Sequence, residues 1–315
     1  MADSITLHPF GLQYYLLLVA AWSLRLPAMI LDWTKKRKSL DVLETRGVTR
    51  KRIQVPSREN GRTIAVDIYE KANQPKDAKR YTHLNFHGSG FIIPSLGSDV
   101  DFCSDLASTG VVVFDADYRK APEHPFPAAY YDAQDVLSYI QNHSSDFDVS
   151  RLTIGGFSAG ANLAMALAVT SPPGSIVGLA SFYGNTDLTS VYPAPNEKSY
   201  DAGTVLPAWL RRFFYRCYVL PNQDRADPRL SPANAPLDRW PKHVFLACGT
   251  ADSLHEAGRI MIDRLRESGH RDAEFLSVER EAHAFDKSAK EGSPTEKKTQ
   301  EVYRKALAMI ERSHE

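Results

Sequence analysis

The chain has 315 residues, with 38 basic and 38 acidic side chains, and 43% of its residues are hydrophobic. A chain of this length can bury the core of one large domain or two small ones, and zero net charge gives no indication of a nucleic-acid partner. Its three cysteines, Cys103, Cys217 and Cys248, lack metal-ligand spacing, so the sequence predicts no disulfide framework and a reducing, cytoplasmic location.

The N-terminal region carries an apolar run at 12–24, which Arg25 and Pro27 interrupt before it reaches the ~20 residues that span a bilayer. No Lys or Arg precedes the run, so a secretory signal is not expected. We predict an amphipathic or buried helix that covers a site, with loose membrane contact as the alternative. The basic run at 35–38 is expected at the solvated end of a helix.

Short apolar runs and helical patterns then alternate along the chain. Runs at 52–55 and 63–69 flank a turn at 59–62, which predicts a β-hairpin. Six further strands are predicted at 83–86, 111–115, 151–155, 175–182, 243–248 and 273–278. Helices are predicted at 98–108, 128–142, 161–169, 254–267 and 294–312. This pattern predicts an α/β fold with an eight-stranded, mostly parallel sheet, helices on both faces and an antiparallel edge.

Residues 185–241 depart from this alternation, because they are rich in Pro, Tyr, Trp and Arg and carry only one short helical pattern, at 208–219. We therefore predict N-terminal cap helices at 1–45 and one main domain at 46–315, with a cap insertion at about 185–241. No internal repeat is found.

A strand, a sharp turn and a helix meet at Gly156-Phe157-Ser158-Ala159-Gly160. A G-x-S-x-G sequence at such a junction can hold its serine in a strained conformation, while the small flanking residues let strand and helix pass closely. The alternative is a glycine-rich turn that only connects two elements. Partners for the Ser158 hydroxyl would distinguish a functional turn from a connecting one.

Two later residues can supply those partners. A nucleophilic serine needs a base and an acid that orients the base, both at the ends of later strands. Asp252 and His283 follow the last two predicted strands. Taken singly, Asp252 could cap the next helix and His283 could be an ordinary loop histidine, but their order favours a triad with Ser158. Asp187 is the alternative acid, although a turn-forming role suits it better.

Donors for an oxyanion can come from His87-Gly88-Ser89-Gly90, which follows a predicted strand. The backbone N–H groups of Gly88 and Ser89 could converge with that of Ala159 on one oxygen, with His87 and Gly90 supporting the loop. A turn without function is the alternative. His83 and His87 lie across a strand end rather than on a helix, so no metal site is predicted.

Four blocks together resemble one known family: 87–91, 117–128, the turn around Ser158, and 249–254 with 283–285. Over residues 55–312 the chain resembles the hormone-sensitive-lipase-like family of α/β-hydrolases, which includes microbial esterases and arylacetamide deacetylase-like enzymes. The resemblance implies cofactor-free ester hydrolysis with Ser158 as nucleophile, His283 as base and Asp252 orienting it.

Three positions depart from the pattern of that family. Ser89 replaces the third glycine of H-G-G-G, Phe157 replaces an aspartate before the nucleophile, and Ala284 replaces the glycine of His-Gly-Phe. We expect a differently shaped loop at Ser89, because non-glycine residues resist positive φ, and a specialised pocket.

The sequence therefore predicts a serine esterase for short- to medium-acyl or bulky aromatic and natural-product esters. Phe157, Trp209 and Phe213 are predicted to line the pocket. An acyl-transferring or lactone-forming enzyme would use the same triad. A non-catalytic binding protein, like the gibberellin receptors of the family, would lack the catalytic histidine, which this chain retains as His283. A small-molecule ester is the expected partner, and a homodimer stays open.

Overall fold

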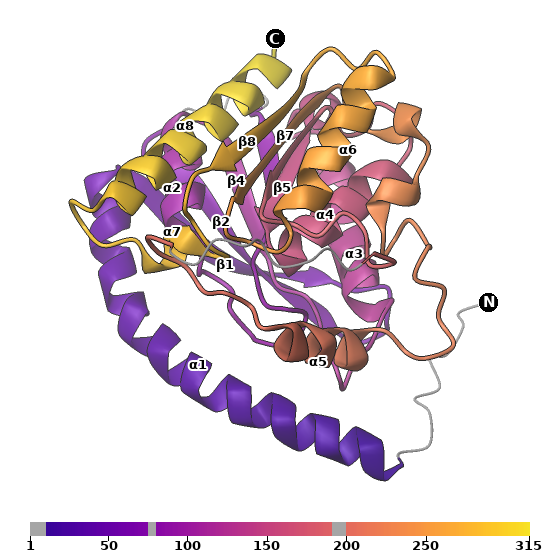
Figure 1. Ribbon diagram of the computed structural model, residues 1–315. Helices are drawn as coiled ribbons and strands as arrows, with labels where there is room; N and C mark the ends of the chain where they lie inside the picture. Colours follow the sequence, from indigo (N-terminus) through magenta and orange to yellow (C-terminus); the bar gives the residue numbers. More distant parts are fainter. Residues whose placement is uncertain (1–10, 75–79, 191–199) are drawn as a thin grey trace.

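Figure 1 shows a computed structural model of the chain, which describes residues 11–74, 80–190 and 200–315, without the side chains of 30–40. An eight-stranded sheet forms its centre, in the order β1-β2-β4-β3-β5-β6-β7-β8. The strands are β1 (Val48–Pro56), β2 (Thr63–Lys71), β3 (Thr82–Phe86), β4 (Val112–Ala116), β5 (Thr153–Phe157), β6 (Gly178–Phe182), β7 (His243–Gly249) and β8 (Ala273–Val278). The predicted fold class is confirmed.

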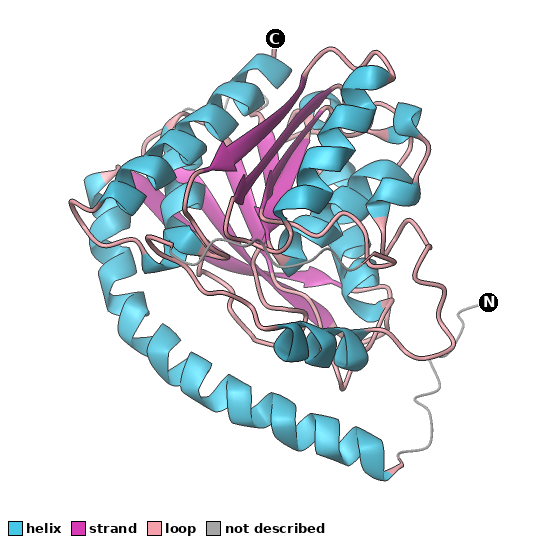
Figure 2. Ribbon diagram, in the orientation of Figure 1, coloured by secondary structure: helices cyan, strands magenta, loops and turns pink. Residues whose placement is uncertain are grey.

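Helices lie on both sides of this sheet (Figure 2). They are α1 (Leu12–Thr45), α2 (Val100–Ser108), α3 (Ala128–Asn142), α4 (Ala159–Thr170), α5 (Ala208–Tyr218), α6 (His255–Glu267), α7 (Phe285–Ser288) and α8 (Pro294–Ser313). Short 3₁₀ turns occur at Val149–Arg151, Pro232–Asn234 and Leu237–Arg239. The last long helix begins with a proline at its first position, and the Ser293 hydroxyl accepts the N–H of Glu296, as expected for a helix N-cap.

Strands β3 to β8 run parallel to one another, whereas β2 is antiparallel to both β1 and β4. The predicted hairpin and antiparallel edge are therefore confirmed. The carboxyl ends of parallel strands share one edge of a sheet, which is where the loops after β3, β5, β7 and β8 come together.

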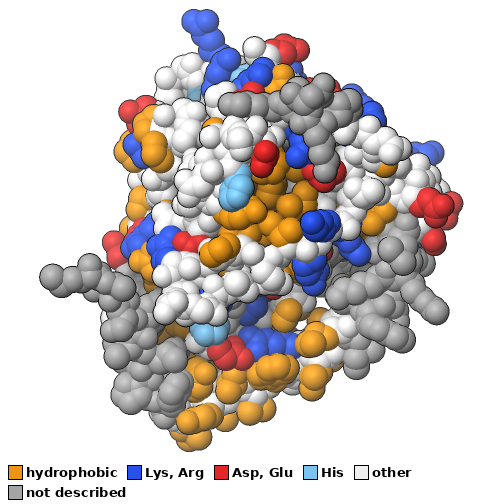
Figure 3. Space-filling view, turned by 180° about the vertical axis from the view of Figure 1, so that it is seen from behind, with side chains coloured by type: hydrophobic (Ala, Val, Ile, Leu, Met, Phe, Trp, Pro, Cys, Tyr) orange, Lys and Arg blue, Asp and Glu red, His pale blue; other side chains and the backbone are white. Residues whose placement is uncertain are grey.

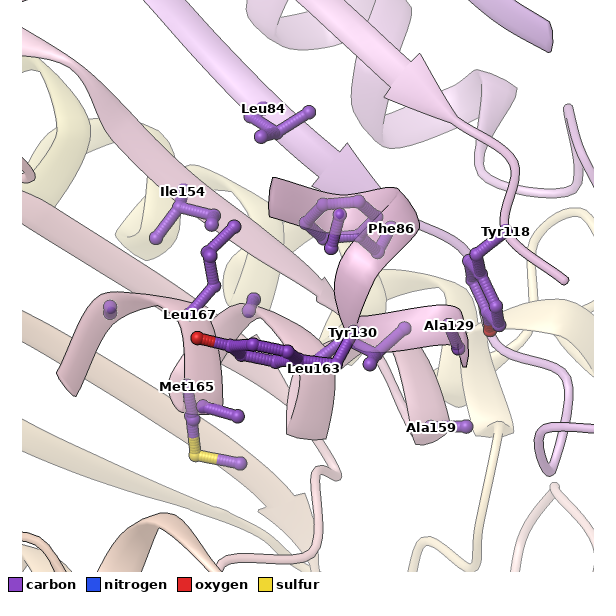
Figure 4. Close-up of a cluster of buried hydrophobic side chains, with 14 of the residues drawn as sticks. Leu84, Phe86, Tyr118, Ala129, Tyr130, Ile154, Ala159, Leu163, Met165 and Leu167 are labelled. Carbon is purple, nitrogen blue, oxygen red and sulfur yellow. The ribbon is translucent and has the colours of Figure 1, made fainter. Parts of the chain in front are cut away.

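Two hydrophobic clusters fill the space between sheet and helices. One contains side chains of α3, α4 and α6, and the other contains side chains of α2, α7 and α8. Helix α4 lies at the centre of the first cluster, where Leu163 and Leu167 pack with Ile154 of β5 and Phe86 of β3 (Figure 4). The helix that follows Ser158 is therefore anchored in the middle of the core.

Helix α1 differs from its prediction in two ways. It is one continuous helix of 34 residues that passes through Pro27, so the basic run at 35–38 lies within it rather than at its end. It is also not buried as a whole: Ala21 and Arg25 face the protein, whereas Leu12 and Val19 are exposed. Residues 1–10 of the predicted N-terminal cap lie outside the described residues. No helix in the described part of the chain is long and apolar enough to cross a membrane.

Helix α5 forms within the predicted insertion and ends one residue earlier than expected. The Phe126 N–H donates to the Tyr218 carbonyl over 2.8 Å, and the ring of Tyr218 stacks on that of Phe91 at 3.7 Å between centroids. These contacts hold α5 against the loop that follows β3. Residues 191–199 of the insertion lie outside the described residues.

Candidate active site

Ser158 occupies the sharp turn between β5 and α4, with φ 52° and ψ −116°. A side chain on Gly156 or Gly160 would collide with the Phe86 carbonyl oxygen, which lies 2.5 Å and 2.0 Å from the respective Cβ positions. Only glycine allows β5 and α4 to pass the end of β3 this closely. The Ser158 N–H donates to the Phe182 carbonyl over 2.9 Å, which fixes the turn against β6.

The structure joins the side chains of Ser158, His283 and Asp252 in one chain of hydrogen bonds. The Ser158 Oγ lies 2.8 Å from the His283 Nε2, and the His283 Nδ1 lies 2.6 Å from the Asp252 Oδ2. A carboxylate only accepts, so Nδ1 carries the proton and Nε2 accepts the serine hydroxyl. This tautomer leaves Nε2 ready to take a proton from Ser158.

Asp252 is itself held in place. Its Oδ1 accepts the Leu254 N–H over 3.0 Å, and its carboxylate is almost completely buried. Burial together with the nearby Asp252 charge raises the pKa of the Cys248 thiol well above its usual range, so this cysteine stays protonated. The alternative acid, Asp187, accepts the Thr189 N–H in a local turn, which is the turn-forming role that suited it better in the sequence.

The loop after β3 lies directly against the turn that carries Ser158. A Cβ on Gly88 would stand 3.5 Å from the Ser158 Cβ. The backbone N–H groups of Gly88, Ser89 and Ala159 donate to no acceptor within the described ranges 11–74, 80–190 and 200–315. Such N–H groups beside a serine hydroxyl are suited to binding a negatively charged oxygen.

Ser89 braces this loop rather than distorting it. The Tyr118 hydroxyl donates to the His87 carbonyl over 2.6 Å and lies 2.7 Å from the Ser89 Oγ, which in turn accepts the Phe91 N–H over 2.8 Å. The positive φ angles of the loop fall at Gly90 and Phe91, not at Ser89. The expected conflict between a non-glycine residue and positive φ therefore does not arise at Ser89.

His87 ties the loop to the segment that follows β4. Its Nε2 lies 3.2 Å from the Asp117 Oδ1, and its ring stacks on Tyr118 with centroids 4.8 Å apart. The Lys120 ammonium donates to the same Asp117 oxygen over 2.7 Å. Burial alone would raise the pKa of Asp117, but His87 and Lys120 hold it well below its usual range. Asp117 and Lys120 thus hold the loop after β3 in place by charge-assisted bonds.

The loop that carries His283 is paired with residues 202–204, which precede α5. The Thr204 N–H donates to the His283 carbonyl over 2.8 Å, and the Ala282 N–H donates to the Ala202 carbonyl over 3.0 Å. A Cβ on Gly249 would lie 2.0 Å from the Glu281 carbonyl oxygen, so glycine is needed where the loops of Asp252 and His283 meet. No pattern in the sequence indicated the pairing with residues 202–204.

A buried polar network stands behind His283. The ring of Tyr183 meets the imidazole edge-on at 4.9 Å between centroids, and its hydroxyl donates to Asp286 over 2.6 Å. Asp286 also accepts the Tyr303 hydroxyl over 2.7 Å and pairs with the Lys287 ammonium at 2.9 Å. Burial would raise the pKa of Asp286, but Lys287 and the two hydroxyls lower it, so the carboxylate stays charged. Sequence reasoning missed this network, because its members come from three separate segments.

The pocket prediction is wrong for Phe157. Its side chain has no exposed surface and lies in the second cluster, stacked on Phe182 at 4.4 Å with the Lys287 ammonium 4.0 Å from its ring centroid. Of the other two predicted residues, Trp209 is 66% exposed, and Phe213 is partly buried against the first cluster.

Two residues that the sequence prediction did not assign to the pocket lie against the loop after β3. A Cβ on Gly90 would meet the ring of Phe214 at 2.9 Å, and Tyr218 stacks on Phe91. Both lie on α5, at i and i+4, and this spacing on a helix of the insertion could have indicated a shared face.

No group of His, Cys, Asp and Glu side chains within the described residues is arranged to hold a metal ion. His83 instead lies inside the sheet, where its Nδ1 is 2.9 Å from the Thr153 Oγ1. Burial lowers the pKa of His83 to about 3, so the ring is neutral and serves the core rather than the site.

Comparisons with known proteins identify the family and the fold. Residues 83–287 match the model of an alpha/beta hydrolase fold family. The chain is 28% identical over 220 residues to the ethyl acetate hydrolase of Pseudomonas putida, covering 67% of this chain and 68% of that protein. It is 30% identical over 202 residues to the gibberellin receptor GID1B of Arabidopsis thaliana, covering 58% of this chain and 54% of the receptor.

A solved esterase from Pyrobaculum calidifontis has the same architecture, with a TM-score of 0.72 at 25% identity, over 90% of this chain and 93% of the esterase. Other curated relatives are matched over smaller shares, from 27% to 56% of their own lengths.

Proposed function

The chain belongs to the alpha/beta hydrolase fold family and is a carboxylesterase-type hydrolase, and on this premise we propose that Ser158, His283 and Asp252 are its catalytic triad. The observation that carries the assignment is the continuous hydrogen-bonded line from Asp252 through His283 to Ser158, at 2.6 and 2.8 Å. A buried acid, an oriented imidazole and a serine in a strained turn are the components that acyl transfer to serine requires.

In this mechanism the Ser158 Oγ attacks the carbonyl carbon of the ester, and its proton passes to the His283 Nε2. Asp252 accepts the Nδ1–H of the resulting imidazolium and stabilises its charge. The N–H groups of Gly88, Ser89 and Ala159 bind the oxyanion. As the C–O bond breaks, the alcohol leaves with the proton from Nε2. Water then attacks the acyl-enzyme by the same route and releases the acid.

We propose short- to medium-acyl esters as substrates, with bulky aromatic or natural-product alcohols as the leaving groups. The similarity to an ethyl acetate hydrolase supports a short acyl group. The position of α5 supports a small site, because Phe214 and Tyr218 lie directly on the oxyanion loop. In this proposal α1 and the insertion at about 185–241 form the cap, and the chain works in the cytoplasm, which suits its three free cysteines.

A second candidate is a non-catalytic receptor for a small molecule, which the similarity to a gibberellin receptor favours. Such a protein would not need a serine in hydrogen-bond contact with an imidazole. The geometry at Ser158 and His283 therefore supports the hydrolase in preference.

The test is turnover of p-nitrophenyl esters from acetate to palmitate by the wild type and by Ser158→Ala. We expect serine-dependent release that is fastest with short acyl chains. A folded Ser158→Ala protein with wild-type turnover would refute the mechanism, and a folded wild type that turns over no member of the series would favour the receptor. Adding an alcohol and analysing the products separates hydrolysis from acyl transfer.

A further inference from the structure

Large exposed hydrophobic side chains are confined to two segments within the described residues. Seven of them lie on α1, and they are Leu12, Tyr15, Leu16, Val19, Trp22, Leu26 and Met29. The other three, Tyr200, Val205 and Trp209, lie just before α5 or at its start. Figure 1 shows α1 and α5 along the same edge of the molecule, and Figure 3 shows hydrophobic side chains gathered at that edge. The large exposed apolar side chains are therefore concentrated on α1 and near α5, and most of them lie on α1.

The seven residues on α1 form a stripe along the outer side of the helix. They recur at intervals of three and four, so they share one face of a 3.6-residue helix over about five turns. The exposed fraction reaches 70% at Val19 in the middle of the stripe. The opposite face holds Leu17 and Ala21, which pack into the first cluster. We call the seven residues the α1 stripe.

The part of α1 that carries the stripe has only one charged residue, and it points inward. The Arg25 guanidinium is buried, pairs with Glu123 at 2.6 Å, and donates to the Ile92 carbonyl over 2.9 Å and the Ala121 carbonyl over 2.8 Å. The outer face of 12–29 therefore has no charge at all. Arg25 fixes this face outward, because turning the helix would leave a buried guanidinium and several acceptors unpaired.

Charge favours a lipid surface over a second copy of this chain as the occupant. Two-stranded helical pairs carry charged residues beside the seam, and none flanks the α1 stripe. The stripe instead includes Tyr15 and Trp22, which suit the boundary between headgroups and acyl chains. Four consecutive basic residues, at 35–38, follow on the same helix, and such runs are attracted to anionic headgroups.

We propose that the α1 stripe docks the protein on the surface of an anionic membrane, with the helix lying in the plane of the interface. The helix does not cross the bilayer, because Arg25 ties its inner face to the protein. An apolar face that enters the headgroup region and a basic run beside it are the two contributions that hold helices at such surfaces. This inference does not depend on the hydrolase activity.

The test is flotation of the full chain with vesicles of phosphatidylcholine alone, and of phosphatidylcholine and phosphatidylserine in equal parts. We expect the wild type to bind the mixed vesicles more strongly. Val19→Glu should lower the bound-to-free ratio by about tenfold or more, because it places a charge at the centre of the stripe. Gln13→Glu is the control, because it adds the same charge to the same helix but outside the stripe, about 100° around the helix axis from Leu12. We expect it to change the bound-to-free ratio by less than about threefold, which on a logarithmic scale is about half of the tenfold change expected for Val19→Glu.

Melting temperature and circular dichroism check that both variants fold as the wild type does, whether or not the chain turns over any ester. Equal vesicle binding by Val19→Glu and wild type would overturn the proposal, as would a folded wild type that binds neither vesicle. A third outcome would assign the α1 stripe to a second copy of the chain and overturn the lipid proposal. In that outcome neither protein binds vesicles, and the wild type is a dimer in vesicle-free solution whereas Val19→Glu is a monomer.

Discussion

The two loops that would supply Ser158 and His283 are built in opposite ways. The Ser158 turn is held by the backbone, because Gly156 and Gly160 let β5 and α4 pass within contact of the Phe86 carbonyl. The His283 loop is held by groups from elsewhere in the chain: Thr204 from the insertion and Tyr183 from the end of β6. One half of the site is thus a local structure, and the other half is an assembly of distant segments.

This difference separates two kinds of failure. Changes at Gly156 and Gly160 of the Ser158 turn should damage the fold itself, since the strand and helix that they join lie at the centre of the molecule. Changes around His283 should leave the fold intact and misplace the imidazole, since each of its supports is a single hydrogen bond or ring contact. The following predictions test that contrast.

The largest effect is expected from Asp252→Asn, which keeps the shape of the side chain but removes the carboxylate that orients His283. We expect kcat for a p-nitrophenyl ester to fall by about 10⁴, with a nearly unchanged melting temperature. Asp187→Asn is the matched control, because Asp187 was the alternative acid and only closes a local turn. A large loss in Asp187→Asn and none in Asp252→Asn would reverse the assignment.

Gly160→Ala should act on the fold. Its added Cβ would lie 2.0 Å from the Phe86 oxygen and 2.5 Å from the His87 oxygen, and both are backbone atoms, which cannot move aside as the end of a flexible side chain can. We expect the free energy of unfolding to fall by about 3 kcal/mol or more, measured by urea denaturation. Gly174→Ala is the control: nothing lies within 4 Å of its Cβ, so only the positive φ of 78° should count, at about 1 kcal/mol. Similar losses in both variants would contradict the packing argument.

Acid should weaken the sheet beneath the Ser158 turn through His83, whose ring lies 3.0 Å from a Cβ built on Gly155. Burial lowers the pKa of His83 from 6.5 to about 3 in the folded chain. Between these values the unfolded chain binds a proton that the folded chain does not, so stability decreases as the pH falls through this range. At about pH 5 the loss from this residue is about 2 kcal/mol.

The measurement for His83 is the urea midpoint at about pH 7 and about pH 5, for wild type and His83→Gln. The variant should lose this part of the pH dependence, although its stability at neutral pH also changes. The same pH dependence in both proteins would show that His83 is not the responsible group.

The smallest effect is expected at Tyr183, behind the imidazole. Tyr183→Phe removes one donor to Asp286, whose other partners Tyr303 and Lys287 remain. We expect kcat to fall by about threefold to tenfold with KM unchanged, which corresponds to about 1 kcal/mol. Tyr303→Phe removes a donor to the same carboxylate, but no ring contact joins Tyr303 to His283 within the described residues. Tyr303→Phe should lower the stability about as much as Tyr183→Phe does, but with a smaller loss of kcat. Equal losses of kcat in the two variants would show that the role of Tyr183 is purely structural.

How far the sequence could predict each part follows from the same contrast. The Ser158 turn could be predicted, because Gly156 and Gly160 and the apolar runs beside them are contiguous. Ser89 was expected to distort its loop, and the structure instead shows a brace with Tyr118, which lies 29 positions away. Phe157 was assigned to the pocket from its place beside Ser158, but alternate residues of a strand point to opposite faces, and this one points into the core.

The supports of His283 could not be predicted, because they join segments that are far apart in the sequence. Ala202 and Glu281 are 79 positions apart, and Tyr183 and Asp286 are 103 positions apart. Helix α1 was expected to be amphipathic or buried. Apart from Arg25, residues 12–29 carry no charge on either side of the helix, and the inward position of Arg25 shows which side faces the protein.

The central claim is that Ser158 is a nucleophile activated by His283. The most direct measurement is labelling of the folded wild type and of His283→Ala with a p-nitrophenyl phosphonate, followed by intact mass and peptide mapping. A single phosphonyl adduct on Ser158 in the wild type, formed far more slowly in His283→Ala, is the predicted result. No adduct on Ser158, or equal labelling rates in the two proteins, would contradict the account.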